Sequence, residues 1–117
     1  MTVATTEAAK TMPAAFAEGV GADDMLARAT EAAGLLKALG HEGRLMILCY
    51  LSEGECSVTE LETRLGLRQA AVSQQLARLR AEGLVGCRRE GKAIYYSIAD
   101  KRAAELVKTL YGLFCGV

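Results

Sequence analysis

The sequence predicts a mainly α-helical domain that contains one β-hairpin. Apolar residues recur every three or four positions over residues 23–39, 42–52, 57–65, 69–82 and 100–115, the period of helices with one buried face. Over residues 85–98 the period changes to two on both sides of Glu90–Gly91, as in two paired strands joined by a tight turn. We therefore expect about five helices and a two-stranded hairpin.

The 117 residues divide into a tail and one domain. Residues 1–22 are rich in Ala, Thr and Gly and predict a mobile N-terminal tail, so residues 23–117 form the folded domain. The longest strongly apolar run, Leu45–Leu51, is far shorter than the ~18 residues of a membrane span. No signal-peptide pattern opens the chain, which indicates a cytoplasmic protein with reduced thiols. Its four cysteines are then core residues, metal ligands or redox groups.

Capping residues mark where the helices begin and end. Asp23 or Asp24 can begin the first helix, and Gly40 ends it. Ser57 can cap the third helix, and Glu60 stands at the capping-box spacing. The glycines at 66 and 83 permit a turn after the third helix and a cap after the fourth, and Asp100 can cap the last.

Charge is unevenly distributed although the net charge is zero. Residues 64–92 hold seven basic and two acidic side chains, a net charge of +5, and the remainder holds seven against twelve, a net charge of −5. On charge alone, the basic block is either a polyanion-binding surface or a solvated charged face.

Two helices joined by a tight turn and followed by a basic hairpin form the winged-helix arrangement, in which the second helix enters the major groove of DNA. The outward face of the helix at 69–82 is small or polar, as a reading helix requires. The candidate DNA-binding residues are the base-reading Gln69, Ser73, Gln74 and Gln75, and the backbone-binding Arg78, Arg88, Arg89 and Lys92.

The segments "RQAAVSQQLARLRAEGLVGCRREGKAIYYSI" and "LKALGHEGRLMILCYL" resemble the ArsR/SmtB family of winged-helix repressors. The resemblance covers about Leu35 to Cys115. It implies a homodimer, formed by the first and last helices, that binds an inverted repeat in double-stranded operator DNA until an inducer releases it. It implies no cofactor and no enzymatic activity.

Many members of this family sense metals, but their ligands are missing here. Ser57 and Thr59 stand where one family site has two cysteines, and Cys56 is one residue out of register. Lys101 and Arg102 follow Asp100 where a second site needs histidine. No Cys-x-Cys or Cys-x-x-Cys is present, and the single histidine, His41, reads as a helix cap or surface residue. We therefore expect no metal site.

The chain resembles more closely the sulfide- and persulfide-responsive (BigR/SqrR-like) subgroup, the biofilm growth-associated repressors. Cys49 and Cys115 match the subgroup's cysteines in the second and last helices. The resemblance implies that reactive sulfur species join them by a di- or polysulfide and so release the DNA. Arg44, one helical turn before Cys49, could lower its pKa.

Alternatives remain at this point. The repressor could sense a metal or general oxidants, or the chain could be a small thiol sulfurtransferase, although neither "LCYLS" nor "LFCGV" offers the expected Gly-rich or basic surroundings. Cys56 begins a helix, where thiol pKa falls, and is a candidate competing thiol, whereas Cys87 on the hairpin is accessory.

Overall fold

The computed structural model describes residues 21–116, so the tail predicted for residues 1–22 lies almost wholly outside the described residues. The described part of the chain divides into two compact units, the first ending at Lys37 and the second beginning at Ala38. In the first unit, helix α3 (Ala22–Leu39) begins with Asp23 and Asp24 in its first turn and reaches Lys37 near its end. These charges complement the helix dipole at both ends.

The second unit contains four helices and a small sheet. The helices are α4 (Glu42–Glu53), α5 (Val58–Leu65), α6 (Gln69–Ala81) and α7 (Lys101–Cys115). The strands are β1 (Cys56–Ser57), β2 (Val85–Glu90) and β3 (Ala93–Ile98), antiparallel in the order β1-β3-β2. With α3, residues 21–116 thus contain five helices and the wing, as expected. None of the described helices is both long enough and apolar enough to cross a membrane.

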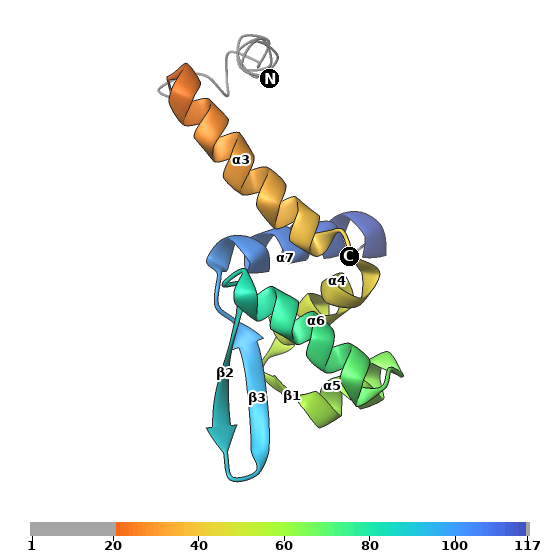
Figure 1. Cartoon of the computed structure of the whole chain (residues 1–117). Coiled ribbons are helices and arrows are strands. Elements are labelled where there is room, and N and C mark those ends of the chain that lie inside the picture. The colour runs from red at the N-terminus through yellow and green to blue at the C-terminus, as the bar shows by residue number, and fades with distance from the viewer. Residues whose placement is uncertain (1–20, 117) are drawn as a thin grey trace. The chain divides into compact units, whose positions relative to one another are not determined.

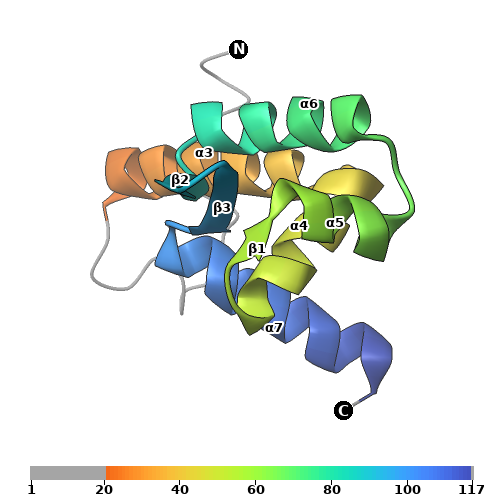
Figure 2. The same cartoon turned by 90° about the horizontal axis from the view of Figure 1, so that it is seen from below.

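Helix α4 lies at the centre of this unit. It packs against α6 on one side and against α7 on the other, and it also contacts α5 and β3 (Figure 2). Its inner residues Ile47, Leu48 and Leu51 are buried together with residues of α5, α6 and α7, among them Leu61, Val72, Leu76, Leu79 and Val107. A displacement of α4 therefore changes its packing against both α6 and α7.

The predicted helix signals are confirmed. Ser57 and Glu60 form the reciprocal capping box of α5, and Gly66 adopts the left-handed conformation (φ 66°) that the turn into α6 requires. His41 caps α4, since its Nδ1 accepts hydrogen bonds from the amides of Gly43 and Arg44.

The β-hairpin of β2 and β3 projects away from the helices (Figure 1). Its turn is one residue later than the sequence suggested, because Glu90 pairs with Ala93 and the two turn residues are Gly91 and Lys92. Gly91 takes the positive φ (63°) that such a two-residue turn needs at its first position. Strand β1 was not predicted, because two residues are too few to show a period of two.

Asp100 caps α7 as expected, accepting from the amide of Arg102 at 2.8 Å and from its guanidinium at 2.9 Å. The side-chain hydrogen bond from Arg102 is the main cause that lowers the pKa of Asp100 below its usual range.

We expect Asp100→Ala to lower the free energy of unfolding by about 0.5–2 kcal/mol at pH 7. Because the folded-state pKa is depressed, this contribution is complete above the ordinary pKa of aspartate, about 4, and disappears as pH falls through the lowered value. Urea denaturation from pH 7 to acid measures it. Asp100→Asn, which keeps a capping oxygen, is the control, and a wild-type-to-alanine difference independent of pH would contradict the assignment.

Candidate functional site

The outer face of α6 is the first candidate site. Val72, Leu76 and Leu79 are fully buried and fix the inner side of the helix against the core. The opposite side is exposed and carries small and polar residues: Gln69, Ala70, Ser73, Gln74, Ala77 and Arg78. A thin, polar helix face of this kind fits the major groove.

The end of α6 leads directly into the wing. The amide of Gly83 donates to the carbonyl of Arg80, and that of Leu84 donates to the carbonyl of Leu79, at 2.9 and 3.0 Å. This is the Schellman arrangement, with Gly83 left-handed at φ 73°, as the sequence predicted. Leu84 and Val85 are buried, so the wing begins anchored to the core.

Gln74 and Gln75 differ in their surroundings although they are neighbours in the sequence. Gln74 is exposed. Gln75 is half-buried, and its side-chain oxygen accepts a hydrogen bond from the Arg44 guanidinium at 3.2 Å. Sequence periodicity did not reveal this partner, which lies 31 residues earlier on α4.

Arg88 is held within the protein by two carboxylates and a ring. Its guanidinium hydrogen-bonds Glu55 and Glu90, and it lies over the Tyr95 ring at 4.8 Å from the centroid. The hydrogen bond from Arg88 holds the pKa of Glu55 below its usual range, and the two carboxylates raise the pKa of Arg88. Much of the charge of Arg88 is therefore neutralised locally.

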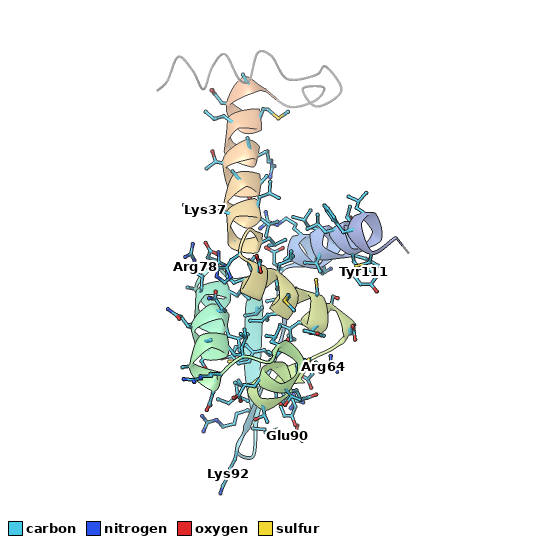
Figure 3. All side chains as sticks on the ribbon, turned by 90° about the vertical axis from the view of Figure 1, so that its right-hand side faces the viewer. Lys37, Arg64, Arg78, Glu90, Lys92 and Tyr111 are labelled. Carbon is cyan, nitrogen blue, oxygen red and sulfur yellow. The ribbon has the colours of Figure 1, made fainter. Side chains whose placement is uncertain are left out.

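Two other basic residues of the wing are available to a polyanion. Arg89 and Lys92 are exposed and make no ion pair within residues 21–116. Lys92 lies at the hairpin tip, well separated from Arg78 on α6 (Figure 3). Arg78 is exposed and forms a loose ion pair with Glu82 at 3.6 Å.

The second candidate site is a pocket between α4 and α7, with a volume of about 520 Å³. Cys49 from α4 and Cys115 from the last position of α7 both line it, with Met46, Tyr50, Lys108 and Tyr111. The structure thus places the two predicted redox cysteines in one pocket, and both are free thiols.

The two thiols of this pocket are not equivalent. Cys115 is exposed, whereas Cys49 is half-buried. Burial raises the pKa of Cys49, and the charges of Cys115 and Glu53 raise it further. The expectation that Arg44 lowers this pKa was wrong, because its guanidinium donates instead to the carbonyl of Ala38 at 2.6 Å and to Gln75.

The other two cysteines lie on the sheet. Cys56 on β1 and Cys87 on β2 are both paired with Tyr96 of the central strand, and only Cys87 is exposed. Burial raises the pKa of Cys56, and its thiol donates to the carbonyl of Gly54 at 3.7 Å. The expectation of a reactive Cys56 was therefore wrong: although it precedes the N-cap of α5, the residue is only 3% exposed, and burial raises the thiol pKa instead of lowering it.

No group of three or more His, Cys, Asp or Glu side chains within residues 21–116 is arranged to hold a metal ion. Ser57 and Glu60 lie near the position of one family metal site. The side chain of each accepts a hydrogen bond from the backbone amide of the other in the capping box.

Comparison with known proteins agrees with this architecture. Residues 41–86 match the family model described as "Bacterial regulatory protein, arsR family". The biofilm growth-associated repressor of Agrobacterium fabrum is 53% identical over 88 residues, covering 75% of each chain. The repressor BigR of Xylella fastidiosa superposes with a TM-score of 0.75 and 49% identity, over 82% of this chain and 98% of that one.

Reduced HlyU from Vibrio cholerae superposes with a TM-score of 0.76 and 42% identity, over 78% of this chain and 96% of that one. These relatives are transcriptional regulators, so the sulfurtransferase alternative is excluded. An exposed reading helix, an anchored basic wing and this level of identity lead to one conclusion: the chain belongs to the arsR family of winged-helix, DNA-binding transcriptional regulators and is not an enzyme.

Proposed function

We propose that the protein is a cytoplasmic repressor that binds an inverted-repeat operator as a homodimer and leaves it when reactive sulfur species crosslink Cys49 and Cys115. The observation that carries this proposal is the shared pocket: the two cysteines lie on α4 and α7. Since α4 also packs against α6, a covalent link at the pocket can alter the position of the reading helix.

Gln69, Ser73 and Gln74 read base edges in this proposal, and Arg78, Arg89 and Lys92 bind phosphates. The exposed polar face of α6 supports the first group, and the exposed charges of α6 and the wing support the second. Gln75 and Arg88 remain predicted DNA-binding residues, but both are already engaged by protein partners.

A homodimer is supported by the apolar end of α7. Tyr111, Leu113 and Phe114 are 53%, 72% and 83% exposed in the single chain, and a second copy would bury them. Sedimentation measures this: a chain that remains monomeric at the concentrations that saturate the operator would contradict the homodimer.

The proposed chemistry uses an organic persulfide, RSSH, as the oxidant. The thiolate of the accessible Cys115 attacks the outer sulfur and breaks the S–S bond, so that RS⁻ leaves, takes a proton from water, and Cys115 becomes a persulfide. The Cys49 thiol then attacks Sγ of Cys115, and the terminal sulfur leaves with two electrons as hydrogen sulfide. A further transfer before ring closure leaves an extra sulfur in the bridge. The raised pKa of Cys49 makes it the weaker first nucleophile.

The extra sulfur of the longer bridge would also favour persulfide over peroxide, because two thiols held too far apart for an easy disulfide can still be joined through it. A direct disulfide requires Cα atoms within about 4.4–6.8 Å, and each inserted sulfur relaxes that limit. We therefore expect persulfide to form the crosslink more readily than peroxide does.

The test uses the reduced protein and an operator duplex selected from random sequences. Tight binding that persulfide reverses, with a crosslink mass on the intact protein, supports the proposal. Failure to bind any duplex tightly at physiological salt would refute the repressor, and equal release by peroxide or by a metal ion would refute the persulfide inducer.

The wing offers a test of the phosphate contacts with a matched pair of arginines. Arg89→Ala should reduce the slope of log affinity against log salt by about 0.9, the contribution of one phosphate contact. Arg88→Ala should reduce it by clearly less, because Glu55 and Glu90 already neutralise Arg88. Titrations from low to physiological salt measure both slopes, and equal reductions would contradict the distinction.

A further inference from the structure

Gln75 lies on the inner side of α6. The buried residues Val72, Leu76 and Leu79 define that side, and Gln75 is three residues after the first and four before the last. Residues with this spacing share one helix face. A polar side chain on an apolar face needs a partner, and Arg44 of α4 supplies it.

Arg44 links two groups with different donors. Its Nε donates to the carbonyl of Ala38, 2.6 Å away, and one terminal nitrogen donates to Oε1 of Gln75, 3.2 Å away. Ala38 is buried in the last turn of α3, where backbone carbonyls lack partners within the helix. The rigid planar guanidinium therefore fixes the Gln75 side chain relative to the start of α4.

Close packing at Gly43 completes this joint. A Cβ at Gly43 would lie 3.1 Å from the His41 ring and 3.7 Å from Cγ of Gln75. The Gln75 side chain thus lies next to the first turn of α4, where a side chain at Gly43 would touch it, beside the imidazole that caps the helix. Polar and packing contacts both hold α6 to α4 at this point.

We propose that Arg44 and Gln75 are a positioning pair that sets the orientation of the recognition helix on α4, and that Gln75 contributes to DNA binding through this pair and not by contacting a base. The inference rests on the DNA-binding part of the proposed function and is independent of the inducer.

The test is a double-mutant cycle on operator affinity, measured with reduced protein. Arg44→Met and Gln75→Met should each weaken binding by about tenfold, equivalent to about 1.4 kcal/mol. The double variant should bind no more weakly than Arg44→Met alone, because Gln75→Met has no interaction with Arg44 left to remove. The losses should be equal across a set of operators that each carry one base-pair change.

Gln74→Met is the matched control. As an exposed base reader, it should change the preference at one operator position, and its effect should add to that of Arg44→Met. Additivity between Arg44→Met and Gln75→Met, or a base preference altered by Gln75→Met, would overturn the positioning role.

Gln75→Glu decides the matter if a methionine variant does not fold. The carboxylate keeps the acceptor for Arg44, so a positioning residue should tolerate it with affinity within about threefold of wild type. A base-reading glutamine would lose its contact and place a negative charge against the DNA, and a loss of about a hundredfold or more would overturn the proposal. Absence of DNA binding by the folded wild-type protein would instead refute the proposed function.

Discussion

Cys115→Ser should bind the operator as tightly as wild type when reduced, and should stay bound when persulfide is added. Wild-type affinity should fall by about 5–150-fold under the same treatment, the usual range for coupling between two sites. Serine fills nearly the same volume at this exposed position but cannot accept a sulfur atom, so the fold and the DNA surface are preserved.

Intact mass spectrometry and fluorescence anisotropy measure this prediction on one sample. Wild type should gain a crosslink. Cys49→Ser should gain sulfur on Cys115 but form no crosslink. Cys87→Ser is the matched control, because Cys87 is also exposed but lies on the wing, outside the pocket. A crosslink that persists in Cys115→Ser, or DNA release by persulfide in that variant, would eliminate Cys115 as a sensor.

Leu76→Ala should lower the free energy of unfolding by about 2–5 kcal/mol, a large part of the stability of a domain this small. Leu76 is fully buried on the inner side of α6, where it packs the reading helix onto the core. Truncation removes its apolar contacts and leaves a cavity that rigid neighbours fill only in part.

Urea denaturation monitored by circular dichroism measures this loss. Leu67→Ala, in the turn before α6, is the control: Leu67 is 41% exposed, and its truncation should cost no more than about 0.5 kcal/mol. Equal costs for the two variants would mean that α6 is not held by its buried face.

The elements predicted correctly from sequence are those specified by neighbouring residues. The capping box of Ser57 and Glu60, the turn at Gly66 and the buried stripe of α6 each depend on residues within one or two helical turns. Local hydrogen bonds and periodic burial determine these features, so their pattern is visible before the chain folds.

What the sequence did not reveal depends on contacts between distant segments. Strand β1 exists because Cys56 pairs with Tyr96, forty residues later, and the Cys56 side chain is buried in that strand. The partner of Gln75 lies on another helix, and so does the pocket wall facing Cys49. The hydrophobic period of a helix or strand indicates which of its faces is buried. It does not indicate which side chain of another element contacts a buried polar group.

The short connection between α6 and β2 couples the position of the recognition helix to that of the wing. Three backbone hydrogen bonds, donated by Glu82, Gly83 and Leu84, close the end of α6. The amide of Ala99, at the end of the hairpin, donates to the carbonyl of Leu84 in that connection. Because these hydrogen bonds tie the two elements together, we expect the base contacts proposed for α6 and the phosphate contacts proposed for the wing to break together when α6 moves. Release of the operator should then be abrupt, with few states in which the protein is only partly bound to the DNA.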